Sequence, residues 1–297
     1  MPEENSFKPR VAVLLAAYNG QEFIVNQIDS VLNQVGVVVT IFVSVDHSTD
    51  QTYDIIKQHY NKHSTVVLLP YGQRFGSASK NFYNLILNAH WQNYDFVAFC
   101  DQDDFWLPTK LYQACCELNR NNCDCYSSNL EAVWNDGRRT VLDKSAEQRL
   151  YDHFFSAISA GCTYVLRSDA LLSLKEFLSN NPHFLDFDSH DWLIYALSRE
   201  LKFGWFVDKK SYIFYNQHRG NSFGANVGVR AKIKRWCLIL NGWYGRHCRM
   251  LIHHFNEELF MSVNSGGCTI EDSLQFRRNN LECFFLFVII KLKILRI

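Results

Sequence analysis

The chain has 297 residues, 47% of them hydrophobic, and its 30 basic and 30 acidic residues give a formal net charge of zero. A hydrophobic fraction of this size is ordinary for a globular protein and supports a core. The longest uninterrupted apolar run, residues 283–290, is far shorter than the ~20 residues that span a bilayer. The N-terminal sequence MPEENSFKPR lacks the apolar core of a signal peptide.

Ten cysteines are scattered without a disulfide-like pattern, which predicts free thiols in a reducing compartment. Cys115, Cys116, Cys123 and Cys125 form a cluster, but their spacing matches no common zinc module. We therefore expect a soluble, cytoplasmic enzyme.

The first half of the chain alternates apolar runs with helical periodicity, which predicts an α/β protein with a mostly parallel central sheet. The first strand is expected at residues 10–17. Asn19 is then expected to cap a helix with Phe23, Ile24 and Ile28 on its apolar face. A second strand is expected at residues 37–45.

A predicted capping box at residues 48–51 opens a helix that extends to about residue 59. A third strand, 65–70, precedes a glycine-bracketed loop at 71–76 and a further helix that bears Phe82. Residues 93–107 predict a fourth, buried strand. Beyond residue 121 the pattern weakens, and the remaining elements are expected as strands near 158–166 and 203–207 and a helix at 191–199.

The fourth strand runs directly into three carboxylates, Asp101, Asp103 and Asp104. Ligands of open α/β sheets bind beyond the carboxyl ends of such strands. Asp101 and Asp103, two residues apart, can face one ligand together, and hard oxygens of this kind suit Mg²⁺ or Mn²⁺. The alternative is a solvated acidic turn that caps the helix beginning near Pro108.

Charge is unevenly distributed along the chain. Residues 226–297 contain eleven Lys or Arg and five acids, a net charge of +6, so the first 225 residues carry −6. The last segment mixes aromatic, aliphatic and basic residues, as interfacial helices do. It is expected to meet an anionic membrane surface, or else to pack on its own domain or on a second subunit. The acidic first part argues against nucleic-acid binding.

Several motifs in a fixed order now resemble a known family. AAYNG follows the first strand, VDHSTD the second and CDQDDFW the fourth, while HDW and YNQHRGNSFGAN come later. This order is similar to that of the family 2 glycosyltransferases, in particular the bacterial rhamnosyltransferase-like branch that builds surface polysaccharides. The resemblance implies a GT-A fold over residues 8–226, a nucleotide-sugar donor, a divalent metal and an inverting transfer. Residues 227–297 are then a basic helical extension.

The family pattern also implies roles for individual residues. Nucleotide-binding residues are carried over as Ala17, Tyr18, Asn19, Asp46, Lys80, Asn81, Asp101 and Gln102. Val45 and His47 stand where the family usually has an acid and a glycine, so UDP- and dTDP-sugars both remain candidate donors.

The same resemblance places the metal and the chemistry. Its implied ligands for Mn²⁺ or Mg²⁺ are Asp101, Asp103 and His218, and Asp191 matches the base that deprotonates the acceptor hydroxyl. Residues implied near the donor or acceptor sugar are Asp104, Trp106, Gly161, Cys162, His190, Trp192 and Arg219. Asp104 can instead cap the next helix, and Trp106 can instead belong to the core.

Other functions use similar parts. A sugar nucleotidyltransferase shares a nucleotide-binding core and acids for Mg²⁺. It normally has a phosphate loop rich in Gly and in Arg or Lys after the first strand, and AAYNGQEF is not such a loop. A phosphohydrolase needs a nucleophile or second-metal cluster that the sequence does not offer. A catalytically degenerate nucleotide-binding module is the third alternative. The expected acceptor is a glycan, lipid-linked if the tail binds the inner face of the cell membrane.

Overall fold

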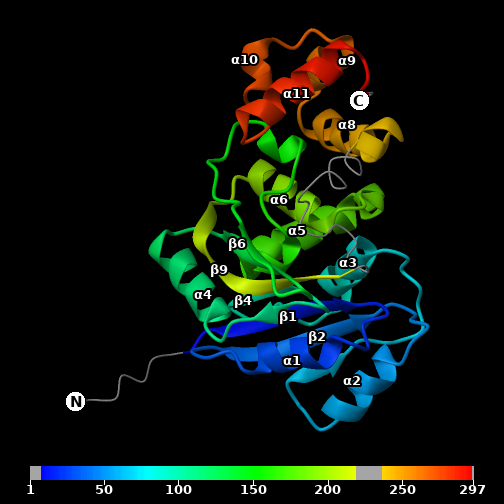
Figure 1. Ribbon diagram of the computed structural model, residues 1–297, viewed down its shortest axis with the longest axis vertical. Helices are drawn as coiled ribbons and strands as arrows, with labels where there is room; N and C mark the ends of the chain where they lie inside the picture. Colours follow the sequence, from blue (N-terminus) through cyan, green and yellow to red (C-terminus); the bar gives the residue numbers. More distant parts are fainter. Residues whose placement is uncertain (1–7, 219–235, 296–297) are drawn as a thin grey trace.

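A computed structural model describes residues 8–218 and 236–295. Its centre is one nine-stranded sheet with helices on both faces (Figure 1). Four parallel strands form its first part in the order β3-β2-β1-β4, as expected for alternating strands and helices. These strands are β1 (Arg10–Ala17), β2 (Val38–Val45), β3 (Val66–Leu68) and β4 (Phe96–Asp101).

The second part of the sheet is mixed. β8 pairs antiparallel with β4 and with β6, β6 runs parallel to β9, and β9 pairs antiparallel with β5. The parallel arrangement predicted for the sheet therefore holds for its first half. The further strands are β5 (Phe105–Trp106), β6 (Cys125–Trp134), β7 (Arg139–Leu142), β8 (Val165–Arg167) and β9 (Trp205–Gln217).

Successive residues of β1 point to opposite faces of the sheet and join two different cores. Val11 and Val13 pack on the side of α1, α2 and α4, whereas Ala12 and Leu14 pack on the side of α3, α5 and α6. A strand buried on both faces gives a continuous apolar run, so its ends were predictable. The helices are α1 (Ile24–Leu32), α2 (Thr52–Tyr60), α3 (Ala78–Asn88), α4 (Lys110–Arg120), α5 (Ser168–Asn180) and α6 (His190–Glu200).

Two predicted helix starts are wrong. Asn19 does not cap α1: it has a left-handed backbone (φ 47°), and Phe23 is the residue that precedes the helix. The box at residues 48–51 does not form either. Ser48 donates to the carbonyl of Asp46, and the carboxylate of Asp50 accepts from the amide of Thr52, where α2 begins.

The strand expected at 158–166 is mostly a turn. Gly161–Thr163 forms a short 3₁₀ helix, and only residues from Val165 onward pair as β8. The amide of Tyr164 donates to the carbonyl of Gly161, which closes the turn. The segment expected at 203–207 begins the much longer β9.

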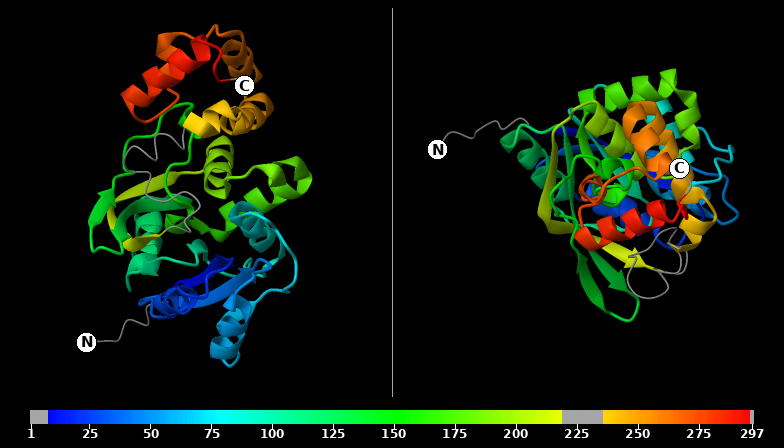
Figure 2. Two further views of the ribbon diagram at one scale, coloured as in Figure 1. Left: turned by 45° about the vertical axis from the view of Figure 1, so that its right-hand side comes forward. Right: turned by 90° about the horizontal axis from the view of Figure 1, so that it is seen from above.

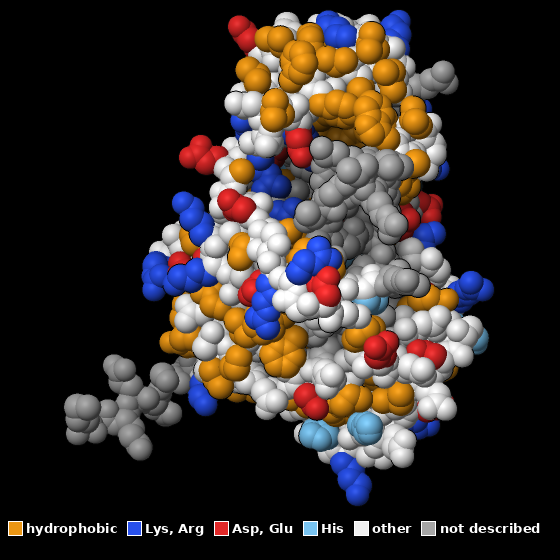
Figure 3. Space-filling model, in the orientation of Figure 1, with side chains coloured by type: hydrophobic (Ala, Val, Ile, Leu, Met, Phe, Trp, Pro, Cys, Tyr) orange, Lys and Arg blue, Asp and Glu red, His pale blue; other side chains and the backbone are white. Residues whose placement is uncertain are grey.

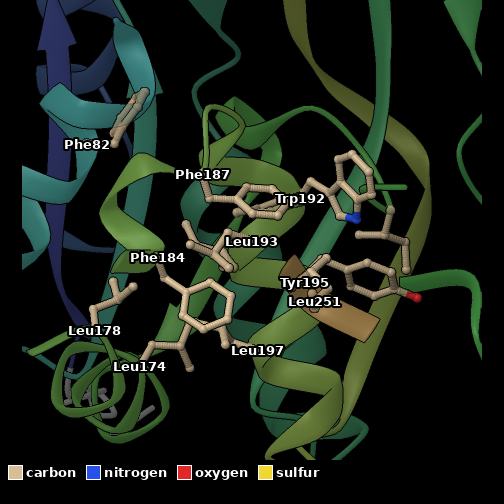
Figure 4. Packing of buried hydrophobic residues seen from close by; sticks show 14 of the residues in the cluster. Phe82, Leu174, Leu178, Phe184, Phe187, Trp192, Leu193, Tyr195, Leu197 and Leu251 are labelled. Atoms are coloured by element: carbon tan, nitrogen blue, oxygen red, sulfur yellow. The ribbon is translucent and has the colours of Figure 1, made fainter. Parts of the chain in front are cut away.

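The C-terminal helices lie on the same face of the sheet as α5 and α6, far from α1 and α2 (Figures 1 and 2). Leu251 and Leu286 share one hydrophobic cluster with Tyr195 and Leu197 of α6, and Figure 4 shows Leu251 beside them. The C-terminal extension therefore completes the hydrophobic core on the side of the sheet that α5 and α6 cover. Among the described residues, no helix has the length and apolarity needed to cross a membrane. These helices are α8 (Trp243–Phe255), α9 (Glu257–Ser265), α10 (Ile270–Ser273) and α11 (Asn280–Lys291).

Candidate active site

The sequence-predicted site residues gather at the carboxyl ends of β1, β2 and β4. Ala17 lies opposite Val45 across one strand pair, and Ala16 lies opposite Asp101 across the other. This edge of a sheet is where open α/β folds bind their ligands. The topology therefore brings the AAYN, VDHSTD and DQDD segments together.

The loops after β1 and β4 are joined by a reciprocal pair of hydrogen bonds. The amide of Tyr18 donates to Gln102 Oε1 at 2.7 Å, and Gln102 Nε2 donates to the carbonyl of Tyr18 at 2.8 Å. Gly20 makes this approach possible, because a Cβ there would lie 2.2 Å from Gln102 Oε1. The Tyr18 ring stays 45% exposed, where a nucleotide base can reach it. Sequence reasoning missed Gly20, although it follows the AAYN motif directly.

Asp46 organises the loop before α3. Its two carboxylate oxygens accept the amides of Phe75 and Gly76 at 2.8 and 2.9 Å, and its own amide donates to the carbonyl of Ala17. The side chain is buried. Each carboxylate oxygen has a second lone pair, so these bonds leave acceptor capacity for a ligand. Asn19 holds the neighbouring turn by accepting the amide of Thr49.

Lys80 and Asn81 at the start of α3 point in different directions. Lys80 Nζ lies 3.1 Å from Asp186, and both side chains are largely exposed. Asn81 is buried, and its Nδ2 donates to the carbonyls of Ser44 and Ala17. Asn81 thus ties the ends of β1 and β2 from beneath, whereas Lys80 reaches the rim.

Two acidic side chains, Asp101 and Asp103, converge with His218 at the end of β4. His218 Nε2 lies 2.7 Å from Asp103 Oδ2, and its ring stacks on Phe23 at 4.6 Å. Burial, with the added charges of Asp103 and Asp191, raises the pKa of Asp101 to about 7. Asn216, which sequence reasoning missed, donates to the carbonyl of Asp103 and fixes this turn.

Asp104 lies beneath this cluster. It is 2% exposed, and neither carboxylate oxygen has a hydrogen-bond partner in the described part of the chain. Burial raises the pKa of Asp104 well above its usual range. The proposal that Asp104 caps the next helix is wrong, because α4 begins at Lys110 without a side-chain cap. Ligand atoms of Asp101, Asp104 and Cys162 lie within 4.8 Å of one another.

Trp106 and Lys110 fill the space below. Trp106 is 1% exposed, which places its ring in the core rather than against a sugar. The Nζ of the buried Lys110 lies 3.6 Å from the centroid of the Trp106 ring. Burial lowers the pKa of Lys110 to about 8, and the charge of Asp104 opposes that shift.

Asp191 lies in the first turn of α6. Its Oδ1 accepts from Ser189 Oγ at 2.6 Å and from the amide of Trp192 at 2.8 Å. Its Oδ2 makes no hydrogen bond within residues 8–218 and 236–295. After burial and the charge of Asp103, the charge of Asp191 is the third cause that raises the pKa of Asp101. Ser189, which orients the carboxylate, was not predicted from the sequence.

The residues around Asp191 are tightly packed. A Cβ on Gly161 would lie 2.5 Å from His190 Nε2 and 3.4 Å from the Cβ of Asp191. His190 stacks on Phe82 at 4.0 Å, and burial lowers its pKa to about 4. His190 and Trp192 are both buried and shape the site from behind, as does the fully buried Cys162. Arg219 lies outside the described residues.

A divalent cation fits this donor set. Burial and the repulsion between neighbouring acids raise the pKa of Asp101, and a positive charge relieves both. Carboxylate oxygens suit Mn²⁺ or Mg²⁺. The thiol of Cys162 is a soft ligand and its pKa is raised by burial, so Asp101, Asp103 and His218 match these ions better.

Comparisons with known proteins identify the family of the chain. Residues 12–169 match the family model "Glycosyl transferase family 2". The dTDP-rhamnosyl transferase RfbG of Shigella flexneri is 37% identical over 254 residues, 85% of this chain and 88% of that protein. WfaP of Escherichia coli, a UDP-Glc:alpha-D-GlcNAc-diphosphoundecaprenol beta-1,3-glucosyltransferase, is 33% identical over 101 residues, 34% of this chain and 38% of WfaP.

A solved structure of S. aureus TarS, residues 1–349 in complex with UDP, superimposes with a TM-score of 0.56 and 16% identity. It covers 96% of this chain and 90% of that one, which supports the fold alone. The predicted GT-A fold and rhamnosyltransferase-like family are thus confirmed. The chain belongs to glycosyl transferase family 2 and is a glycosyltransferase.

Proposed function

We propose that this enzyme transfers a sugar from a UDP- or dTDP-sugar to a hydroxyl of a glycan acceptor, with inversion at the anomeric carbon. The observation that carries the proposal is the placement of Asp191. Its carboxylate is oriented through Oδ1 by Ser189 and Trp192, and its charge acts on Asp101, which supports a place for it beside the cluster of Asp101, Asp103 and His218.

The donor nucleotide is assigned to the edge formed by the first two loops. The exposed ring of Tyr18 offers a stacking surface, and Asp46 retains acceptor capacity for a pyrimidine N–H. The printed name of RfbG, a dTDP-rhamnosyl transferase, makes dTDP-rhamnose the first donor to test.

Asp101, Asp103 and His218 would hold Mn²⁺ or Mg²⁺, which supplies positive charge for the diphosphate of the donor and of the departing nucleotide. Asn216 and Phe23 keep Asp103 and His218 in place for this task. The chain's own contribution is thus a fixed set of oxygen and nitrogen donors.

Asp191 is proposed as the general base. The acceptor hydroxyl loses its proton to Oδ2 while its oxygen bonds the anomeric carbon and the bond from that carbon to the diphosphate breaks. Attack opposite the leaving group inverts the configuration. A positioned base of this kind typically contributes 10²- to 10⁴-fold to the rate.

The acceptor is proposed to be a lipid-linked glycan at the inner face of the cell membrane. WfaP is named for a diphosphoundecaprenol-linked acceptor, which supports this class. Exposed apolar side chains recur along α11 at helical spacing, at Leu281, Phe284, Phe285 and Leu292. Hydrophobic side chains gather over this end of the molecule in Figure 3, and Lys291 and Lys293 lie beside the stripe in sequence.

The products of a donor incubation separate the candidate functions. The enzyme is incubated with dTDP-rhamnose or UDP-glucose and Mn²⁺, with and without a glycan acceptor. Glycosyl transfer releases the nucleoside diphosphate, and acceptor accelerates it. A nucleotidyltransferase instead forms nucleoside triphosphate and sugar 1-phosphate when pyrophosphate is added. Thermal stabilisation by nucleotides, without turnover of any donor or acceptor tested, would favour the binding module. A ligand at 100 times its dissociation constant stabilises by ~2.7 kcal/mol.

A further inference from the structure

His247 links the C-terminal extension to the loop that carries Asp191. It lies on α8, is 2% exposed, and its Nε2 lies 2.9 Å from the backbone nitrogen of Asp188. Its Nδ1 lies 2.7 Å from the carbonyl oxygen of Trp243, one turn earlier on the same helix. Asp188, the residue that His247 contacts, lies three residues before Asp191 in the chain.

The two contacts select one form of the imidazole. The amide of Asp188 can only donate, so Nε2 must accept and carry no proton. The carbonyl of Trp243 can only accept, so Nδ1 must carry the proton. Only the neutral tautomer with Nδ1–H satisfies both partners.

The imidazole of His247 also packs against aromatic rings that precede and follow Asp191 in the sequence. His247 meets the edge of Phe187 with centroids 4.4 Å apart, and it packs on Trp243 at 4.2 Å and near Trp192 at 6.1 Å. Phe187 and Trp192 themselves form an edge-to-face pair, which Figure 4 shows. The segment around Asp191 is therefore held at residues 187, 188 and 192.

We propose that His247 is a positioning residue, which fixes the Asp191 carboxylate by anchoring the Asp188 amide and the flanking rings. The inference rests on the proposed role of Asp191 as base. It gives the extension a part in catalysis that is separate from any contact with a membrane.

Protonation of His247 breaks this arrangement, because Nε2–H and the Asp188 N–H would then oppose each other. The charged groups that act on the imidazole are Arg246 on its own helix and Asp188 on the facing loop. Burial lowers the pKa of His247; the hydrogen bond to the Trp243 carbonyl opposes this, Arg246 adds to it, and Asp188 opposes it. The anchored form is thus the stable one at neutral pH.

The test compares His247→Phe and His247→Gln, with His253→Phe on the exposed side of the same helix as the matched control. The phenyl ring keeps the packing but cannot accept the amide, and a small misplacement can cost ~100-fold in rate. We expect His247→Phe to lower kcat about 10- to 100-fold with donor KM nearly unchanged. Gln, a neutral acceptor at every pH, should restore much of kcat.

Two outcomes overturn the inference: a normal kcat in His247→Phe, or an equal loss of kcat in the Phe and Gln variants. Asp191→Asn is measured in parallel. If Asp191→Asn is inactive while His247→Phe is normal, only the positioning role fails. If Asp191→Asn is active, the proposed base itself is wrong, whatever the His247 variants do.

Discussion

Arg278 of the C-terminal extension lies with its Nε 3.6 Å from Oδ2 of Asp152, a residue with no exposed surface. Arg199 of α6 binds the other oxygen of Asp152 at 3.0 Å. Arg278 also donates to the carbonyls of Lys144 and Ala157. A basic residue of the segment for which both a membrane surface and packing on its own domain were expected thus joins the extension to α6.

We expect Asp152→Asn to lower the free energy of unfolding by roughly 3–5 kcal/mol, because it leaves two arginines without their buried counter-charge. Urea unfolding followed by circular dichroism measures this. The exposed pair Arg138–Asp136 supplies the control, and Asp136→Asn should leave the free energy of unfolding almost unchanged. Equal effects from the two variants would contradict a special role for the buried network.

Chelation by EDTA should abolish sugar transfer, and Mn²⁺ or Mg²⁺ should restore it. Asp103→Ala and His218→Ala should each lower the affinity for Mn²⁺ by at least the 10- to 100-fold typical for residues that only support a ligand. Activity is titrated against Mn²⁺ for each variant. Full turnover in excess chelator would refute the metal assignment, and unchanged thermal unfolding would show that the variants are folded.

Asp191→Asn should lower turnover by at least ~100-fold and leave nucleotide affinity nearly unchanged. The amide keeps an oxygen for Ser189 and for the amide of Trp192 but cannot take a proton at neutral pH. Asp169→Asn, in the first turn of α5, is the matched control. NMR of the product should give the anomer opposite to the donor's. A retained anomer would rule out direct displacement.

The contribution of His190 to the stability of the protein should fall as pH decreases from about 6.5 towards 4. A histidine in an unfolded chain has a pKa of about 6.5, and burial lowers the pKa of His190 to about 4 in the folded chain. The unfolded chain therefore binds the proton more tightly over this range. The contribution of His190 is complete above pH ~6.5 and is lost by up to ~1.4 kcal/mol per pH unit below it. Urea unfolding at several pH values should show that the wild-type protein loses stability relative to His190→Gln as the pH falls. The exposed His59→Gln should keep the wild-type pH dependence.

The apolar stripe of α11 should bind vesicles that contain phosphatidylglycerol. Deletion of residues 276–297 would also remove Arg278 and the buried Leu286, so substitutions on the outer face are the cleaner test. Leu281→Ser with Phe284→Ser should weaken co-sedimentation while donor binding stays normal. Binding should also weaken as salt rises, since the Debye length is ~8 Å at physiological ionic strength. An intact protein that ignores these vesicles at low salt would leave the stripe to a second subunit.

The sequence predicted the first half of the fold closely because its central strands β1 and β4 are buried on both faces. β1 occupies the expected residues, and β2 starts one residue later than expected. β6 was not predicted, because Ser127, Ser128 and Asn129 lie in its middle and interrupt any apolar pattern. Their burial depends on distant partners: Trp205 Nε1 donates to Ser127, and Asn129 donates to the carbonyl of Lys209.

The same distinction applies to the site. The order of the motifs predicted that Asp101, Asp103, Asp191 and His218 lie in one region, because each is at or next to the end of a regular element. The side chain of Asp104 is directed into the core by the turn between β4 and β5. The local sequence does not show that this turn lies above a deep core. Contacts such as that between His247 and Asp188 join residues 59 positions apart and follow only from the packed fold.

The shared core of the extension bears on how such enzymes diversify. Leu251 and Leu286 interlock with α6, the helix that carries Asp191. An exchange of C-terminal segments between relatives would therefore leave voids or clashes unless α5 and α6 travelled with them. Recombination between relatives that changes the acceptor should therefore exchange the second half of the chain as one block. The nucleotide-binding half can be kept or replaced independently.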